Sequence, residues 1–262
     1  MSQQAEARIG KTDVFEGYDP EVRIRTKKML MYFIIFSIVM LFGGFTSAYI
    51  VSNMGEYWVH IQAPSTLWIS NAIIILSSVS MIAAVKAIKR GDQKQTVMML
   101  GLTLALGLAF SATQTMAWKE LRSKGMGWTV DTNDQGLEAY SWNNIADITG
   151  EYGKDYYVHR DGKPLVMHEG ELYAANDPTF AVPLTTEVKN MSNNSGAFVW
   201  ALIFIHIAHL ILGLIYLVVN LIRTQKGIVN QQDTIRLEVN ATYWHFLGIL
   251  WLYLFAFLFL IH

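Results

Sequence analysis

The sequence predicts an all-α membrane protein: a five-transmembrane-helix bundle with a small outward-facing extramembrane cap containing a β-hairpin. Of its 262 residues, 52% are hydrophobic and only 16% are charged, which is too apolar for an ordinary soluble domain of this length. Five uncharged spans are each long enough to cross a bilayer, which takes about 20 apolar residues in a helix. One long polar stretch separates the third span from the fourth.

The five spans divide the chain into four regions. We expect helices at Met29–Ser52, Leu67–Val85, Thr96–Trp118, Ala197–Ile222 and Val239–Ile261. Residues 1–28 then form a cytoplasmic N-terminal tail, 29–118 the first three helices, 119–196 a periplasmic cap insert and 197–262 the last two helices. The first span is longer than the apolar core of a signal peptide and no small-residue cleavage site follows it, so we expect a retained helix.

The Lys and Arg residues of the short segments predict the orientation, because cytoplasmic segments carry their excess. The tail before the first span holds six, and the connections after the second and fourth spans hold four and three. The connection after the first span and the residues after the fifth hold none. We therefore expect a cytoplasmic N terminus and a periplasmic C terminus.

The polar stretch at residues 119–196 falls on the outer face in this topology. It carries seven basic and twelve acidic residues. Within "DYYVHRDGKPLVMHEGELYAA", Asp161 and Gly162 lie between two β-rich runs, as in a hairpin turn. At under 80 residues the cap has little interior in which to bury a core of its own, so we expect it to rest on the bundle or on a partner.

Composition excludes several classes of function. The chain has no cysteine, which rules out disulfides, thiolate metal sites, iron–sulfur clusters and cysteine nucleophiles. Its formal net charge of −1 gives no sign of a nucleic-acid partner. The spans contain no Asp, Glu, Lys or Arg, which argues against an ion or proton pump built within this chain alone.

The ionisable residues inside the spans are His206, His209 and His245. One interpretation is haem or metal ligation, since His is the commonest metal ligand. The other is hydrogen bonding between helices or to a partner subunit, because buried polar groups find partners. His206 and His209 lie only three residues apart and cannot clamp one haem from opposite sides, so we favour hydrogen bonding.

Small and polar residues follow one face of the fourth span at spacings of three and four: His206, His209, Gly213, Tyr216 and Asn220. In lipid such a face is ordinarily the packing face, since small side chains permit close approach and polar ones hydrogen-bond across helices. Gln114 belongs to a similar set on the third span, and His245 to one on the fifth. Each of these helices is therefore predicted to have a protein-facing side.

Several of these segments resemble a known family. "IHIAHLILGLI" (Ile205–Ile215) resembles the helix with an H-x-x-H-x-x-x-G pattern in subunit III of haem-copper cytochrome c oxidases. "EVNATYWHFLGILWLYLF" (Glu238–Phe255) is similar to that subunit's last helix. "FSIVMLFGGFTSAYI", "NAIIILSSVS" and "LGLAFSATQ" are similar to the family's other helices in the same order, and the whole set resembles the five-helix bacterial form.

The chain also departs from the family at three carboxylates. Ile38 and Ala117 stand where the family has a Glu, and Gly248 stands where it has an Asp. A proton-antenna or buried-acid role proposed for relatives is therefore not expected at these positions. The long outer insert is also atypical of the family.

The resemblance implies an accessory subunit of a bacterial respiratory oxidase, which couples oxygen reduction to proton pumping in the inner (plasma) membrane. The haems and copper then belong to partner subunits, with no cofactor in this chain and with bound phospholipid. The implied partners are oxidase subunits I and II and membrane lipids, with a cytochrome c domain or another respiratory complex at the 119–196 cap. We expect no catalytic or metal-binding residue, and structural, lipid or subunit contacts at His206, His209, Gly213, Glu238, Trp244, His245 and Gln114.

Two other functions compete with this one. A membrane cytochrome b would use His245 and one histidine of the fourth span as axial ligands, and would show a haem b band in a reduced-minus-oxidised spectrum of the isolated chain. A transporter or channel fits less well, since such proteins tend to use discontinuous helices and polar sites at the midplane.

Overall fold

The computed structural model describes residues 19–52, 57–124, 129–132, 138–141, 148, 150–190 and 195–261. Its long helices are α2 (Pro20–Ser52), α3 (Ser65–Lys89), α4 (Gln93–Ser123), α6 (Ser195–Gln225) and α7 (Ile235–Ala256), the last continued by the π-helical turn η2 (Phe257–Ile261). All five are long and apolar enough to cross a membrane, so the predicted fold class is confirmed.

Local sequence signals explain where the helices begin and turn. α2 starts at Pro20, a residue suited to the first helical position, and the Asp19 side chain accepts a hydrogen bond from the Glu21 amide at 2.9 Å. Part of the predicted tail is therefore helical, while residues 1–18 lie outside the described residues. Between α3 and α4, Gly91 takes a φ of +81° and Asp92 caps α4 by accepting from the Gln95 amide at 2.9 Å.

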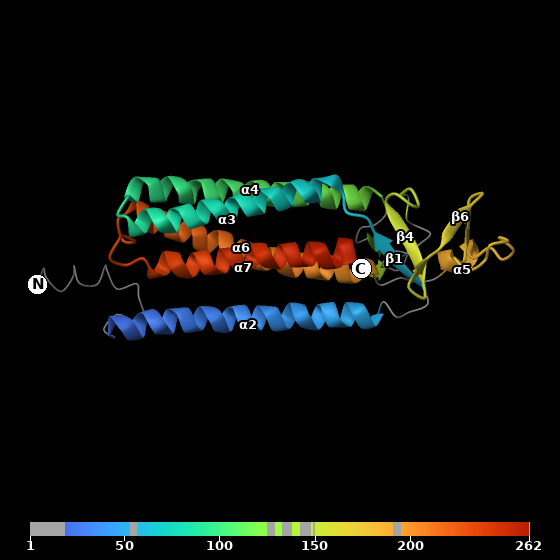
Figure 1. The fold of residues 1–262 in the computed structure, drawn as a ribbon, viewed down its shortest axis with the longest axis horizontal. Helices are drawn as coiled ribbons and strands as arrows, with labels where there is room; N and C mark the ends of the chain where they lie inside the picture. The colour runs from blue at the N-terminus through green and yellow to red at the C-terminus, as the bar shows by residue number, and fades with distance from the viewer. Residues whose placement is uncertain are drawn as a thin grey trace, which may run out of the picture.

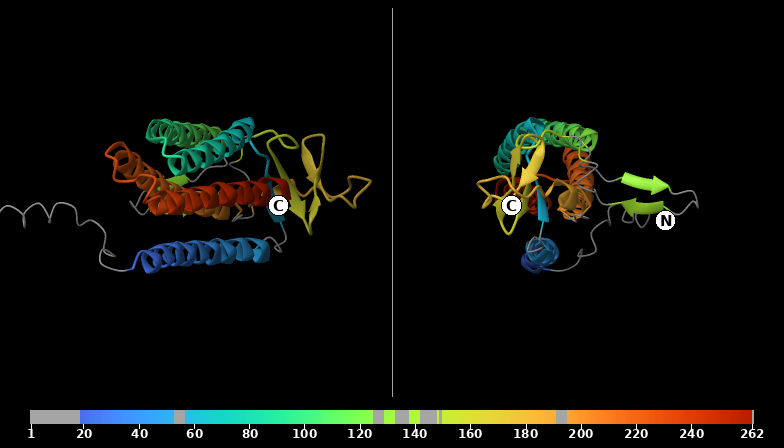
Figure 2. Two further views of the ribbon diagram at one scale, coloured as in Figure 1. Left: turned by 60° about the vertical axis from the view of Figure 1, so that its left-hand side comes forward. Right: turned by 90° about the vertical axis from the view of Figure 1, so that its right-hand side faces the viewer.

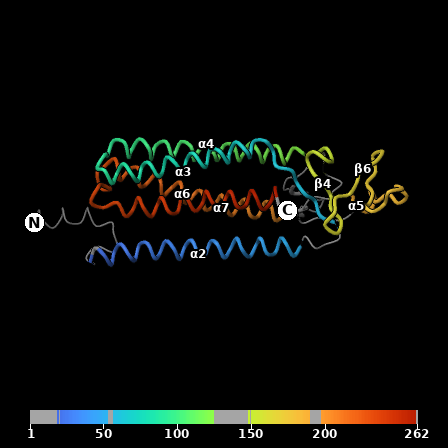
Figure 3. Tube along the Cα trace, in the orientation of Figure 1, coloured from blue at the N-terminus to red at the C-terminus, as the bar shows by residue number. Residues whose placement is uncertain are grey.

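The helices run side by side along the long axis of the molecule (Figure 1). α3 and α4 form an antiparallel pair, α7 packs against α3 and α6, and α2 lies on one side of the bundle against α6 and α7. The tube in Figure 3 shows the α3–α4 and α6–α7 connections at one end, and the C terminus beside the cap at the other. We call these the connection end and the cap end.

The cap contains short antiparallel sheets. The larger sheet has the order β1 (Tyr57–Ile61), β4 (Tyr156–Arg160) and β5 (Lys163–Pro164). β6 (Val166–His168) pairs with β7 (Glu171–Tyr173), and the short helix α5 (Thr185–Asn190) follows. β2 (Thr129–Thr132) pairs with β3 (Glu138–Ser141) in a ribbon set apart from the other strands (Figure 2).

The predicted hairpin at Asp161 and Gly162 is confirmed. Both residues take positive φ angles, 50° and 74°, and Arg160 pairs with Lys163 across the turn. Glu169 and Gly170 repeat this geometry between β6 and β7, with φ angles of 51° and 86°. The turn at Asp161 and Gly162 was predicted from the sequence, whereas the turn at Glu169 and Gly170 was not.

The main partner of β4 is β1, which comes from the connection between α2 and α3. Their register runs from Tyr57 opposite Arg160 to Ile61 opposite Tyr156, and Val59 and Val158 pair at its centre with both side chains buried. Trp58 donates from Nε1 to the Tyr49 hydroxyl at 3.2 Å, which joins the sheet to α2. The cap therefore rests on the bundle through a strand that no sequence signal had indicated.

A salt bridge joins the end of α4 to the turn before β4. Lys124 Nζ lies 2.8 Å from Asp155 Oδ1 and 3.0 Å from Glu120 Oε1. The Lys124 ammonium and the Glu151 amide hold the pKa of the Asp155 carboxyl below its usual value. The Asp155 carboxylate in turn raises the pKa of Lys124.

Replacing Asp155 with Asn should loosen the cap at neutral pH. We expect amide hydrogen exchange in β4 to become about two- to fivefold faster, the effect of losing a partly exposed ion pair. Because the folded-state pKa is lowered, this contribution is present above the ordinary carboxyl pKa of about 4 and is lost as the pH falls through the lower folded value. The exchange rates of wild type and Asp155→Asn should therefore converge in acid. Glu151→Gln removes an exposed ion pair with Lys154, and its exchange rates should equal those of wild type at every pH. An effect of Asp155→Asn that persists unchanged in acid would rule out this explanation.

Candidate functional site: the polar layer of the bundle

Hydrogen bonds between polar side chains hold three helices together inside the bundle. Two of them come from indoles of α7: Trp244 donates to Ser77 Oγ at 3.0 Å, and Trp251 donates to Asn71 Oδ1 at 2.9 Å. Both indoles are buried, at 1% and 2% exposure. Trp244 was among the predicted contact residues, whereas Trp251 was not, although the two stand about two helical turns apart in the aromatic-rich last span.

α4 joins the same layer through two further hydrogen bonds to α3. Gln114 donates from Nε2 to Ser70 Oγ at 2.8 Å, and Ser80 and Thr103 share a hydroxyl hydrogen bond of 2.7 Å. We call this set the polar layer, and its members are Ser70, Asn71, Ser77, Ser80, Thr103, Gln114, Trp244 and Trp251. All of them are buried, and pairing in this way is what a polar group inside a bilayer requires.

Two glycines permit close packing around Trp244: Gly107 makes room for the indole itself, and Gly213 makes room for the neighbouring Leu247. A Cβ added to Gly107 on α4 would lie 2.8 Å from the Trp244 ring and 3.0 Å from Leu214. A Cβ added to Gly213 on α6 would lie 2.8 Å from Leu247 and 3.7 Å from the Trp244 ring. Trp244 therefore fills a slot between α4 and α6 while its nitrogen bonds to α3. Gly213 was predicted as a packing residue.

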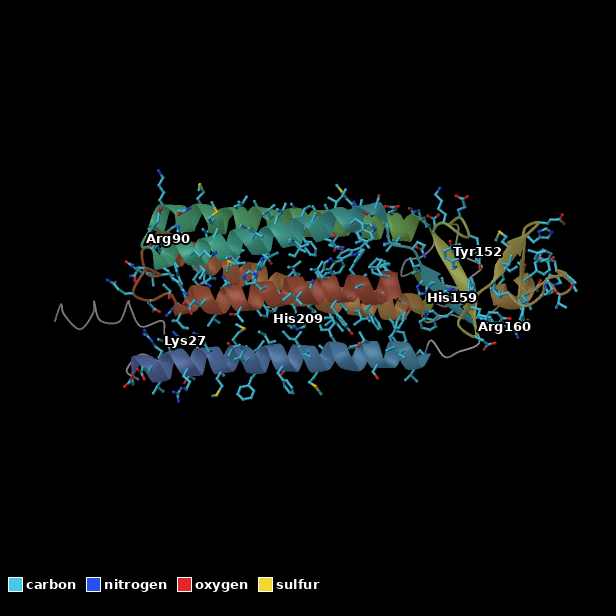
Figure 4. The ribbon with its side chains drawn as sticks, viewed as in Figure 1. Lys27, Arg90, Tyr152, His159, Arg160 and His209 are labelled. Atoms are coloured by element: carbon cyan, nitrogen blue, oxygen red, sulfur yellow. The ribbon has the colours of Figure 1, made fainter. Side chains whose placement is uncertain are left out.

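The three intramembrane histidines face three different neighbours. His206 is 2% exposed and lies against Trp251, with ring centroids 5.3 Å apart. His209 shares a hydrogen bond with the Ile205 carbonyl at 2.8 Å and lies 6.0 Å from the Phe42 ring of α2 (Figure 4). His245 is half-buried in a groove between α3 and α7 beside Ser78 and Gly248. This arrangement does not bring His245 and a histidine of α6 to one haem.

Glu238 forms an ionic cluster at the connection end. Its carboxylate lies 2.9 Å from Lys89 Nζ of α3 and 3.4 Å from Lys28 Nζ of α2. It stands in the first turn of α7, where a negative charge also complements the helix dipole. A predicted contact residue thus joins three helices at this end.

A groove with a basic mouth separates α2 from α6 and α7 at the same end. Lys27, Arg223 and Arg236 surround its mouth. The groove has a volume of about 240 Å³. Its deeper walls are largely apolar and are formed by Leu30, Met31, Ile34, Tyr216 and Val239. The Tyr216 hydroxyl donates to the Arg236 carbonyl at 3.3 Å and so joins α6 to α7 beneath the mouth.

The three positions that lack family carboxylates are enclosed by protein. Ile38 is 5% exposed and Ala117 is fully buried. A Cβ at Gly248 would meet Ile74 and Ser78 at 3.5 Å, an ordinary packing distance. An ionised carboxylate at any of these positions would need a buried partner, and the apolar residues Ile38 and Ala117 and the glycine Gly248 have no such need.

The fold and the polar layer define a multi-pass membrane protein whose buried polar groups join helices. A family model described as cytochrome c oxidase subunit III matches residues 190–261. Over 259 residues the chain is 23% identical to cytochrome c oxidase subunit 3 of Sus scrofa, covering 95% of this chain and 74% of that protein. Both comparisons support the predicted resemblance to cytochrome c oxidase subunit III.

The slot for Trp244 can be tested with three alanine substitutions. Gly107→Ala should lower the free energy of unfolding in detergent by about 1–3 kcal/mol, because its methyl group meets a rigid ring. Gly213→Ala should cost less, because the nearest atom is the far end of the flexible Leu247 side chain. Gly101→Ala on α4, with no atom within 4 Å, is the control and should be neutral or stabilising. Equal stability of Gly107→Ala and Gly101→Ala would contradict the slot.

Proposed function

We propose that this chain is the non-catalytic subunit III of a bacterial respiratory haem-copper oxidase and stabilises subunit I and its lipids during proton-pumping oxygen reduction. The observation that carries the proposal is the polar layer, because the tryptophans of the last helix bond within the bundle and form part of its core. His206, His209, Gly213, Glu238, Trp244, His245 and Gln114 then act as structural, lipid or subunit contacts. The haems and copper belong to subunits I and II, and this chain has no redox centre of its own.

The proposed orientation in the bacterial inner membrane rests on charge. Lys27 and Arg90 lie at the connection end, whereas Tyr152, His159 and Arg160 lie in the cap (Figure 4). Since the connection end holds the basic residues of both short connections, the positive-inside rule favours placing it in the cytoplasm. The cap would then be periplasmic, and so would the C terminus beside it.

Bound phospholipid fits the groove between α2 and the two helices α6 and α7. Its basic mouth would pair with an anionic headgroup, and its apolar walls would receive an acyl chain. A lipid there would fill the space between α2 and the rest of the bundle and so support the contact of the subunit with its neighbours.

Purified oxidase with and without this chain tests the proposal. Without the chain, haem content should be unchanged while turnover decays faster, because the chain supplies stability and no redox centre. The tagged chain should co-purify with a large subunit that carries haem and copper, and with phospholipid that is depleted by Arg223→Gln. Loss of the haems on removing the chain, or a haem band in the isolated chain, would overturn the assignment.

The outer part of the cap offers a surface for a periplasmic partner. Val166, Met167 and Val182 are 42–62% exposed there, and the exposed carboxylates of Glu169 and Glu171 lie at the β6–β7 turn. We propose that this acidic and apolar surface contacts a cytochrome c domain or a neighbouring respiratory complex. Deleting the whole insert would not test this contact alone, because the insert contains β4, the strand that pairs with β1.

Neutralising Glu169 and Glu171 together to Gln should weaken the association of the oxidase with that partner about two- to tenfold at low salt. The effect should shrink at high ionic strength, because exposed charges are screened there. Glu187→Gln on α5 is the matched control. Native gels that show an unaltered complex at low salt would count against the cap as a docking surface.

A further inference from the structure

Two histidines meet on one face of the sheet that joins the cap to the bundle. His60 lies on β1 and His159 on β4, and the centroids of their rings are 5.0 Å apart with an angle of 61° between the ring planes. In the register of the strands His60 is opposite Tyr157 and His159 is opposite Trp58, so the two imidazoles are diagonal neighbours. No metal-binding residue was predicted from the sequence, because about a hundred residues separate the two strands.

The separation of the two rings is that of imidazoles bound to one metal ion. Zinc holds its histidine ligands at Zn–N distances of about 2.0–2.1 Å in tetrahedral geometry, which places two ring centroids about 5 Å apart. His60 and His159 already have this separation. An ion between them would therefore require rotation of the side chains about their torsion angles and no movement of the strands.

The ring nitrogens of this pair allow an ion to approach. His159 is half-buried, makes no hydrogen bond within the described residues, and has neither ring nitrogen enclosed by protein. Nδ1 of His60 is buried, so an ion would bind this residue at Nε2. Burial also lowers the pKa of His159, which favours the neutral imidazole that metal ions require.

The cationic side chain next to His159 points away from the pair. Successive residues of a strand face opposite sides of a sheet, and the Arg160 guanidinium lies over the Tyr57 ring, 5.3 Å from its centroid. Within the described part of the chain, no third His, Cys, Asp or Glu side chain joins the two histidines to make a larger cluster. The remaining coordination positions would therefore belong to water, as in an open zinc site.

We propose that His60 and His159 bind a zinc ion that links β1 to β4 and so stabilises the contact of the cap with the bundle. One nitrogen of each imidazole coordinates the ion, and water completes the tetrahedron. The site lies where the sheet meets α2, because Trp58, the residue opposite His159, donates to the Tyr49 hydroxyl at 3.2 Å. Figure 4 shows His159 in the cap next to the bundle. The site has no redox role and does not rest on the proposed oxidase function.

Zinc at this position would act on the pairing of the two strands. The ion binds both histidines only while β1 and β4 are paired, so it stabilises the paired state by mass action. Hydrogen exchange that requires the strands to separate should slow by the factor 1 + [Zn²⁺]/Kd. At free zinc ten times the Kd, this is about a tenfold decrease in rate.

The test measures zinc binding to the full chain in lipid nanodiscs by titration calorimetry, with amide hydrogen exchange on the same samples. Wild type should bind zinc, and exchange in β1 and β4 should slow about tenfold at ten times the Kd. His60→Gln and His159→Gln should each weaken zinc binding at least about tenfold, because even the loss of a group that orients a ligand costs about 10–100-fold in affinity. His168→Gln on the exposed strand β6 is the matched control and should bind as wild type. Magnesium, which prefers oxygen ligands, should have no effect.

The other outcomes overturn the proposal. Absence of zinc binding, or equal binding by wild type and both variants of the pair, would mean that these histidines hold no ion. Zinc binding without slower exchange in β1 and β4 would mean that the ion does not link the strands. An equal effect of magnesium would indicate screening of surface charge. The exchange measurement on wild type needs no variant, so it decides the question even where a variant fails to fold.

Discussion

The hydrogen bonds that the two tryptophans of α7 donate to α3 set the arrangement of the bundle. Hydrocarbon offers no competing water, and lipid tails are as apolar as the side chains they would replace, so helix packing depends on close fit and on polar pairs. Trp244 meets both requirements, because its ring fills the slot beside Gly107 and Gly213 while its nitrogen bonds to Ser77. α7 is accordingly the most enclosed of the five helices, because 61% of its most apolar 18-residue stretch is buried.

The second constraint acts at the cap end, where the chain leaves the bilayer. The connection between α2 and α3 becomes β1 and pairs along its whole length with β4, which lies about a hundred residues later in the chain. Tyr49 joins the two parts, since its hydroxyl accepts from Trp58 and its ring packs against Phe198 and Phe257. The cap is therefore an extension of the bundle.

The sequence allowed the parts of the fold that depend on local chemistry to be predicted. Five apolar runs and one Asp-Gly pair are strong signals, because membrane length and turn geometry each restrict composition. β1 was missed because its five residues carry no turn signal and its partner is distant. The spacing of polar residues showed which side of each helix is polar. It did not show which helix packs against that side, so it could not show that His206, His209 and His245 face different helices. Trp251 was missed for the same reason, since an indole in an aromatic-rich span could as well have faced lipid.

These contacts divide the bundle into a tightly joined core of α3, α4, α6 and α7 and a more loosely held α2. Only 22% of the most apolar 18-residue stretch of α2 is buried, which is the lowest share among the five helices. Its buried side chains form a single row along the helix, at Met31, Ile38, Phe42 and Tyr49, and the ion pair of Lys28 with Glu238 holds one end. A molecule in the groove beside α2 therefore acts on the weakest interface and can change how α2 is held. The other four helices are fixed by the polar layer, so they keep their arrangement when that groove is filled. The same five helices thus provide one adaptable interface and one rigid core, and the difference follows from where the hydrogen-bonding tryptophans of α7 point.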